Sequence, residues 1–203
     1  MTENLVPGTE GYAEHAEALA SRWDAISFAE LHAPILALLP ARSARVLDIG
    51  AGSGRDAAAF AGMGYEVVAV EPVAALRSRA AERHSSPRIA WVDDSLPHLA
   101  TLTGVAFDVV MLTAVWMHLD APQRAQAIRR TASLIAPGGL MSMSLRHGPL
   151  PGNRRMFDVS AGETVALAIA HGLNVCLQST SNSVQRANRD AGVTWTRLAF
   201  RKA

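Results

Sequence analysis

The chain has 203 residues, of which 49% are hydrophobic and 18% charged, and its formal net charge is +1. This length can bury one sizeable core and favours a single domain, while the small net charge and the lack of a long basic run argue against nucleic-acid binding as the main function. The one cysteine, Cys176, excludes a disulfide or a cysteine-based metal cage within this sequence and fits a reducing, cytoplasmic setting. Neither a leader-like pattern nor an apolar run of membrane-spanning length is found, so we expect neither secretion nor a membrane span.

Residues 10–39 have a pattern that predicts helices. Aromatic and apolar side chains recur there at roughly helical spacing, at Tyr12, His15, Leu19 and Trp23. Ser27 and Glu30 resemble a capping box that opens a second helix. We expect these helices to form an N-terminal cap, residues 1–42, in front of a core that spans residues 43–203.

The motif that organises the sequence is an apolar strand, residues 46–49, followed by a glycine-rich turn and an alanine-rich helix, residues 56–63. Glycines let the backbone approach a ligand and adopt positive φ, and the helix N-terminus offers free N–H groups. A dinucleotide-binding fingerprint needs a small residue where bulky Arg55 stands, and the Lys-Ser/Thr ending of a P-loop is absent. A tight turn without a ligand is the alternative. The turn residues are Asp48, Gly50, Ala51, Gly52 and Gly54.

A second buried strand, residues 66–70, ends on Glu71 and Pro72, about 20 residues after the first glycine. A carboxylate at this strand end can accept hydrogen bonds from both hydroxyls of a ribose. It can also serve the following helix, residues 73–83, because an acid and a proline are favourable at a helix N-terminus. The two roles are compatible, so the pattern predicts a nucleoside-binding site.

The spacing Asp48-x-Gly50-x-Gly52-x-Gly54 resembles the first motif of the class I S-adenosylmethionine-dependent methyltransferases, in which Glu71 matches the acid that binds the ribose. The resemblance extends over nearly the whole chain after the cap. It implies an α/β fold, a doubly wound, Rossmann-like sheet of seven strands, mostly parallel with a C-terminal antiparallel hairpin. It also implies S-adenosylmethionine as the cofactor and S-adenosylhomocysteine as the product, with no metal.

Two later segments resemble further motifs of the same family and occur in the same order along the chain. A short strand, residues 88–92, leads into an acidic turn, where the family binds the exocyclic amine of adenine; an exposed Asx turn is the alternative. The candidates are Asp93, Asp94 and Ser95, and which aspartate faces inward stays open. A fourth strand, residues 107–112, ends where the reactive methyl should lie. The resemblance places the backbone of Thr113 and Ala114 against the amino-acid part of the cofactor.

The acceptor site should lie beside the same strand ends. A loop of basic residues, 146–157, follows a fifth strand, residues 140–145, and its cations suggest an anionic acceptor; a solvated loop is the alternative. The substrate candidates are Tyr12, Trp116, Arg146 and Arg155, with Arg22 and Trp23 as further residues of the cap. The catalytic candidates are His118 and His147, because imidazole titrates near neutrality. For His118, a structural role that fixes its loop is the favoured interpretation.

The rest of the sequence completes the sheet. Residues 137–139, Pro-Gly-Gly, should stop a helix that begins near Asp120 and precede the fifth strand. Two late strands, residues 175–179 and 193–200, flank a polar, exposed or mobile segment, residues 181–192. The sequence therefore predicts methyl transfer to a small-molecule acceptor, with no nucleic-acid or membrane partner. A methyltransferase acting on a protein or RNA, or a non-catalytic cofactor-binding regulator, is the alternative.

Overall fold

The computed structural model describes residues 6–41, 44–150, 152 and 154–203. The predicted boundary between cap and core, at residues 42 and 43, lies outside the described residues, as do Pro151 and Asn153 of the basic loop. Within the described ranges, two strand–helix units span residues 45–83, as the sequence predicted, and two strands, residues 89–92 and 107–112, follow with no helix between them.

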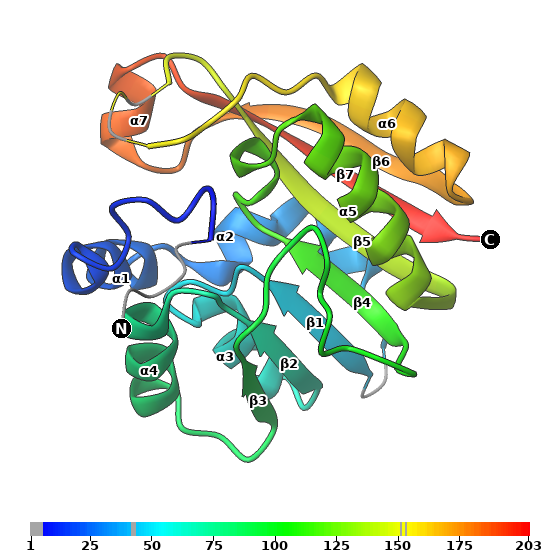
Figure 1. Cartoon of the computed structure of the whole chain (residues 1–203), viewed down its shortest axis with the longest axis horizontal. Coiled ribbons are helices and arrows are strands. Elements are labelled where there is room, and N and C mark those ends of the chain that lie inside the picture. Colours follow the sequence, from blue (N-terminus) through cyan, green and yellow to red (C-terminus); the bar gives the residue numbers. More distant parts are fainter. Residues whose placement is uncertain (1–5, 42–43, 151, 153) are drawn as a thin grey trace.

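A seven-stranded sheet runs through the centre of the molecule (Figure 1). In the order β3-β2-β1-β4-β5-β7-β6 across the sheet, its strands are β3 (Ile89–Val92), β2 (Glu66–Val70), β1 (Arg45–Ile49), β4 (Phe107–Leu112), β5 (Ile135–His147), β7 (Thr194–Lys202) and β6 (Leu173–Asn182). Strands β1 to β5 pair in parallel, whereas β7 pairs antiparallel with both β5 and β6. The predicted fold class, a doubly wound, Rossmann-like sheet with an antiparallel hairpin, is confirmed.

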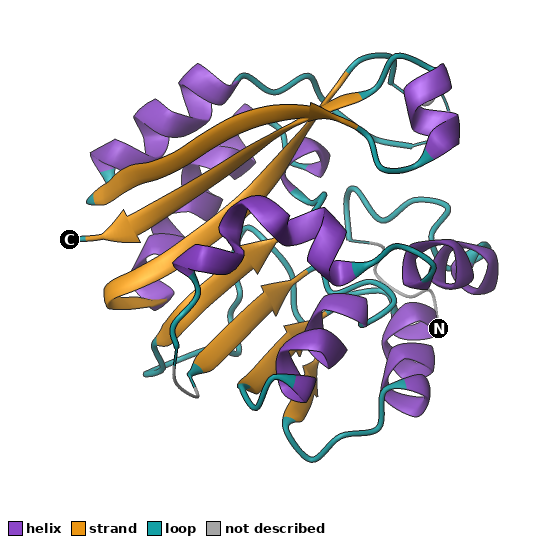
Figure 2. Ribbon diagram, turned by 180° about the vertical axis from the view of Figure 1, so that it is seen from behind, coloured by secondary structure: helices purple, strands orange, loops and turns teal. Residues whose placement is uncertain are grey.

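Helices cover both faces of this sheet (Figure 2). They are α1 (Ala16–Asp24), α2 (Phe28–His32), the 3-10 helix η1 (Ala33–Leu38), α3 (Arg55–Gly62), α4 (Ala74–Arg83), the 3-10 helix η2 (Trp116–His118), α5 (Ala121–Leu134), α6 (Ala161–Ala170) and α7 (Arg186–Asp190). Buried residues of α5 and α6 pack on one face of the sheet, and those of α3 and η1 pack on the other. Among the described residues, no helix combines the length and apolar character that a membrane span needs.

The N-terminal segment begins its helices later than the sequence predicted. Tyr12 lies in a series of turns before α1, where Gly8 and Gly11 have φ values of 95° and 75°. These left-handed conformations are incompatible with a continuous right-handed helix. The Ser27 part of the predicted capping box is present, because the Ser27 hydroxyl accepts a hydrogen bond from the Glu30 amide at 3.4 Å. The cap is therefore helical from α1 onward, and Tyr12 precedes it on a turn.

Strand β5 also differs from the prediction at its start. The predicted strand follows residues 137–139, whereas the observed strand begins at Ile135, directly after α5. Its pairing with β4 shifts register between Phe107 and Val109, and Gly138 lies in this irregular stretch with a φ of 72°. The Pro-Gly-Gly sequence therefore bends the beginning of a strand, because glycine permits positive φ there.

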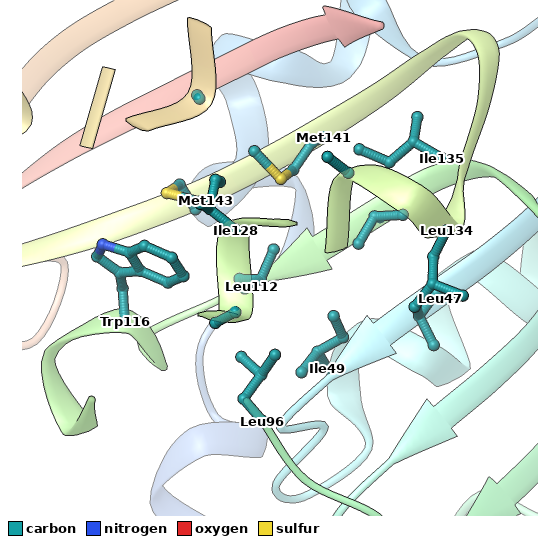
Figure 3. Packing of buried hydrophobic residues seen from close by; sticks show 14 of the residues in the cluster. Leu47, Ile49, Leu96, Leu112, Trp116, Ile128, Leu134, Ile135, Met141 and Met143 are labelled. Atoms are coloured by element: carbon teal, nitrogen blue, oxygen red, sulfur yellow. The ribbon is translucent and has the colours of Figure 1, made fainter. Parts of the chain in front are cut away.

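Trp116 belongs to the hydrophobic core, and its predicted place in the acceptor site is corrected. Its side chain is 0% exposed, and Figure 3 shows the indole beside Leu112, Ile128 and Met143. The residue opens η2, a single 3-10 turn in which successive side chains point in directions about 120° apart. Trp116 therefore packs between α5 and the sheet, while the residues that follow it point elsewhere.

We predict that Trp116→Ala lowers the free energy of unfolding by about 3–5 kcal/mol, because it leaves a large cavity in a packed core. Urea denaturation followed by circular dichroism measures this change. Met63→Ala is the control, because Met63 is 48% exposed at the end of α3, and its loss should cost less than about 0.5 kcal/mol. A Trp116→Ala protein as stable as the wild type would contradict the core assignment.

Candidate cofactor and acceptor site

A cavity of about 480 Å³ lies at the carboxyl ends of the parallel strands, where the strand order reverses between β1 and β4. Open α/β sheets bind ligands at such a switch point, because the loops there diverge to opposite faces of the sheet. The strand ends and their loops line one side of the cavity. The N-terminal cap lines another side through Tyr12, Arg22 and Trp23, so the cap lies over the cavity.

The glycine turn between β1 and α3 presents bare backbone to the cavity. Gly50 has a φ of 71°, and a Cβ there would lie 2.6 Å from a methyl carbon of Val115. Gly52 has a φ of 58°, and a Cβ there would lie 3.2 Å from the indole ring of Trp23. The amides of Gly50 and Ala51 both donate to the Val70 carbonyl, at 2.8 and 3.0 Å, which anchors the turn to β2. Glycine is therefore required here for conformation and for space.

Gly54 has a different position from the other glycines of the motif. It precedes α3 with a φ of 81°, and a Cβ there would lie 2.6 Å from the indole ring of Trp91. It is not among the residues that line the cavity. The contact of Gly54 with the cofactor therefore stays a prediction, and in the structure this glycine lets the chain enter α3 against a packed side chain.

Two buried carboxylates, Asp48 and Glu71, line the cavity beside this turn. Burial, reinforced by the charge of Asp56, raises the pKa of Asp48 well above its usual value, and its buried Oδ2 atom has no hydrogen-bond partner in the part of the chain that the structure describes. Glu71 accepts hydrogen bonds from the amides of Gly52 at 2.8 Å and Val73 at 2.9 Å. Burial nevertheless raises the pKa of Glu71 to about 7. A ligand with hydrogen-bond donors would therefore stabilise both carboxyl groups.

Of the two aspartates after β3, Asp94 lines the cavity and Asp93 does not. Asp93 is exposed and forms an ion pair with Arg77 at 2.9 Å, so its predicted contact with adenine is corrected. Asp94 accepts hydrogen bonds from the amides of Ser95 at 2.7 Å and Thr101 at 2.8 Å. Despite partial burial, hydrogen bonds from Thr101 and Ser95 lower the pKa of Asp94, so its charge is used to hold the turn that presents Ser95 to the cavity.

A buried carboxylate that sequence reasoning missed, Asp56, joins the segments around the cofactor turn. It accepts a hydrogen bond from the Thr113 hydroxyl at 3.0 Å and pairs with His32 Nε2 at 2.8 Å and Arg55 Nε at 2.7 Å. Burial by itself would raise the pKa of Asp56, but His32 and Arg55 outweigh it and hold this pKa well below the usual value. No local pattern links His32, in the cap, to Asp56, in α3, because only tertiary folding brings them together.

The chain after β4 enters the site with Thr113 and Ala114, which both line the cavity. Ala114 has a φ of 60°, an unusual conformation for a residue with a side chain, and its amide donates to the Ser144 hydroxyl at 2.9 Å. This hydrogen bond fixes the backbone turn, while the Thr113 hydroxyl is held by Asp56. The loop therefore offers its backbone to the cavity, a position suited to the predicted contact.

His118 lines the acceptor side of the cavity together with Tyr12. Its Nδ1 lies 3.0 Å from the Arg155 carbonyl oxygen, which can only accept, so Nδ1 carries the proton. Its Nε2 then accepts a hydrogen bond from the Tyr12 hydroxyl at 3.1 Å. Burial lowers the pKa of His118, which favours the neutral ring. Both ring nitrogens thus form hydrogen bonds, as a loop-fixing role requires. The partner of Nε2, Tyr12, itself lines the cavity.

Two other predicted site residues lie away from the cavity, and their assignments are corrected. His147 forms a hydrogen bond to the Thr196 hydroxyl at 2.8 Å and is not a lining residue. Arg155 pairs with Asp120 at 3.0 Å. Its neighbour Arg154 lines the cavity instead, with its guanidinium 4.5 Å from the centre of the Tyr12 ring. Consecutive residues of a loop point in different directions, so the sequence could not select between two adjacent arginines.

The acceptor side contains several residues that sequence reasoning did not identify. Arg146, which it did identify, is joined there by Ser144, Arg154, Trp195, Arg197 and Asn188. Asn188 comes from α7, a short helix inside the segment 181–192 that was predicted to be polar and exposed or mobile. The only local signal was an arginine in the middle of a late strand. That signal is weak, because a strand residue faces solvent or protein according to its partners.

Comparisons with known proteins find similar sequences and a similar fold. Residues 46–139 match the model of a family described as a methyltransferase domain. The structure of the N-methyltransferase NodS from Bradyrhizobium japonicum with S-adenosyl-L-homocysteine has a TM-score of 0.73 and 20% identity, covering 95% of this chain and 99% of that chain. The 1,6-didemethyltoxoflavin-N1-methyltransferase of Burkholderia thailandensis has a TM-score of 0.66 and 23% identity, covering 100% and 93%. Residues 46–139 are thus similar to a methyltransferase domain, and the chain has the fold of these S-adenosylmethionine-dependent methyltransferase structures.

Curated relatives are similar over part of their length. A ubiquinone biosynthesis O-methyltransferase of Xanthomonas campestris is 33% identical over 63% of this chain and 57% of its own length. The protein of that name from Albidiferax ferrireducens is 31% identical over 53% of this chain and 43% of its own length. The chain thus matches about half the length of these curated relatives.

We predict that Asp56→Asn lowers the free energy of unfolding at pH 7 by about 3–5 kcal/mol, because it leaves Arg55 and His32 without their buried partner. The folded pKa of Asp56 lies below the usual 3.8, so the stabilisation is present above that pH and is lost as the pH falls toward the folded value. Urea denaturation of both proteins between pH 7 and pH 3 measures the difference.

The matched control for this experiment is Asp93→Asn, which removes an exposed ion pair and should change the stability little. A stability difference between wild type and Asp56→Asn that stays constant down to pH 3 would contradict the proposed electrostatic origin.

Proposed function

We propose that this protein transfers the methyl group of S-adenosylmethionine to a small-molecule acceptor. The observation that carries the proposal is a single cavity that joins a glycine turn and two buried carboxylates to a cationic wall. Support also comes from the methyltransferase domain match. It comes in addition from relatives whose names describe small-molecule reactions, in ubiquinone biosynthesis and on 1,6-didemethyltoxoflavin.

The residues on the first wall fit the cofactor. Asp48 lines the cavity beside the bare backbone of Gly50 and Gly52, and its Oδ2 has no hydrogen-bond partner among the described residues, so a positively charged amino-acid group would be stabilised there. Glu71 can accept the hydroxyls of a ribose. Ser95, with Asp94 behind it, would meet the adenine, and Pro72 would line the nucleoside side. The backbone of Ala51, Thr113 and Ala114 completes this proposed binding site.

The catalytic effect proposed here is proximity and orientation. S-adenosylmethionine supplies, when bound, an electrophilic methyl group that needs no metal for activation. The chain's own task is to hold the acceptor in line with the bond that breaks and to keep water away. The cap can do this, because Tyr12 and Trp23 lie over the cavity. Where the acceptor must lose a proton, Nε2 of His118 is the candidate base, acting through or beside the Tyr12 hydroxyl.

Arg146 and Arg154 give the acceptor side a positive charge, which favours an anionic acceptor. A single domain with a cap at residues 1–42 and a core at residues 43–203 accounts for the one continuous sheet. A cytoplasmic location stays a prediction from composition. The alternatives are a protein or RNA methyltransferase and a regulator that binds the cofactor without turnover.

Calorimetry with S-adenosylmethionine and S-adenosylhomocysteine, followed by a labelled-methyl screen over small acids, amines, a protein extract and RNA, tests the proposal. We expect binding of both cofactor forms and label in a small molecule. Label found only in protein or RNA would show that the acceptor is a macromolecule and not a small molecule. Tight binding without transfer to any class would favour the regulator, and failure of both ligands to bind would overturn the proposal.

We predict that Glu71→Gln weakens S-adenosylhomocysteine binding by about 10- to 100-fold, because it removes one charged hydrogen-bond acceptor for the ribose. In the wild type the affinity should fall as the pH drops below about 7, because the carboxyl is then increasingly protonated before binding. The variant should lack this pH dependence. Calorimetry between pH 8 and pH 5.5 measures both effects.

The control for this prediction is Glu66→Gln, on the exposed start of the same strand, where Glu66 pairs with Arg88. It should leave the affinity unchanged. Equal affinity in wild type and Glu71→Gln would remove Glu71 from the proposed ribose site.

A further inference from the structure

A patch of four side chains on β5 and β7 forms the cationic wall of the cavity. Ser144 lies opposite Arg197 in the antiparallel pairing, and Arg146 lies opposite Trp195. Opposite residues, and residues two apart on one strand, project from the same face of a sheet. All four therefore share one face, and all four line the cavity. We call this set the β5–β7 patch.

The rest of that face is covered by protein. Leu140 on β5 and Ala199 on β7 are fully buried there, in the cluster that also contains residues of α3 and η1. Farther along the same strands these helices no longer cover the sheet, and the β5–β7 patch opens into the cavity instead. A face that is apolar under the helices thus becomes polar and cationic where a ligand can reach it.

Arg197 is the most unusual member of the patch, because it is only 8% exposed. Its Nη1 donates to the Ser181 hydroxyl at 3.2 Å. Within the described part of the chain it forms no ion pair with a carboxylate, and burial is the cause that lowers its pKa. By contrast Arg124, which is 5% exposed, pairs with Glu163 at 3.1 Å. Buried arginines are rare without an acid, so Arg197 is a cation whose partner is expected from outside the chain.

Arg146 provides a second cation beside it. Its Nη1 donates to the Pro149 carbonyl at 2.7 Å, and among the described residues it too has no acidic partner. The carboxylates that line the cavity are Asp48, Asp56, Glu71 and Asp94, and these belong to the ends of β1 and β2, to α3 and to the turn after β3. The cavity therefore has an acidic side that suits the cofactor and a basic side that suits an anion.

We propose that Arg197 and Arg146 bind a carboxylate of the methyl acceptor, and that the acceptor is a small organic acid. The inference rests on the proposed function and deepens it by naming the substrate class. A guanidinium matches a carboxylate with two parallel hydrogen bonds, and Ser181 orients the Arg197 group. Trp195 and Met156, which also line the cavity, give the body of the acid an apolar surface.

The test measures binding of paired probes to the protein saturated with S-adenosylhomocysteine. The probes are acetate, benzoate and indole-3-acetate, their neutral amides, and phenylphosphonate. We expect at least one of the acids to bind about tenfold or more tightly than its amide and than phenylphosphonate. Absence of binding by all three acids, or equal binding of acids and amides, would overturn the proposal. A preference for phenylphosphonate would overturn the carboxylate assignment in favour of a phosphoryl group.

Variants of Arg197 test whether this residue is responsible for binding the acid. Arg197→Gln should weaken binding of the preferred acid by about tenfold or more, and Arg197→Lys should retain part of it because the charge remains. Arg186→Gln is the matched control, since Arg186 is an exposed arginine of α7 that does not line the cavity. Thermal melting checks that each variant is folded, and the comparison of acids with amides in the wild type needs no variant.

Separate titrations with S-adenosylhomocysteine keep the two proposals apart. We expect the same cofactor affinity in Arg197→Gln as in the wild type. A parallel loss of cofactor affinity would overturn the inference, because Arg197 would then bind the carboxylate of the cofactor itself. Failure of the wild type to bind S-adenosylhomocysteine would count against the proposed function, whereas unchanged acid binding in Arg197→Gln would count against this inference alone.

Discussion

The site depends first on one buried carboxylate, Asp56, around which three separate segments meet. Its partners are His32 of the cap, Arg55 at the start of α3 and Thr113 at the end of β4. A buried charge is costly unless all its neighbours stay in place, so this group couples the position of the cap to that of the glycine turn. Arg55 extends the coupling, because its guanidinium also donates to the Trp23 carbonyl at 3.2 Å. These contacts around Asp56 therefore fix the N-terminal cap relative to the glycine turn that lines the cavity.

The second constraint is the distribution of charge along the cavity. Asp48 and Glu71 lie at the ends of β1 and β2, and Arg146 and Arg197 lie on β5 and β7. The two sides belong to opposite halves of the sheet, which the strand order brings together at its switch point. A cationic donor and an anionic acceptor would each find the complementary side, so the same arrangement orients both reactants.

Much of the fold and of the proposed cofactor site could be predicted from local patterns. The apolar runs gave the bounds of β2 and β4, and the glycine turn and the acid after β2 marked the cavity. The residues on the acceptor side of the cavity were harder to predict from the sequence. Trp116 follows the right strand and has a suitable side chain, yet its ring turns into the core. Spacing along a chain indicates that a residue is near a strand end, but not the side on which it lies.

The sequence by itself determined the order of strands and helices, the turn that needs glycine and the acid that follows the next strand, because these depend on near neighbours in the chain. The tertiary structure alone decided that Asp94 and not Asp93, and Arg154 and not Arg155, reach the cavity. It also decided that Arg197 lies beside Arg146, because an antiparallel register between distant strands places them on one face. Residue direction is set by packing partners, and those partners are remote in sequence.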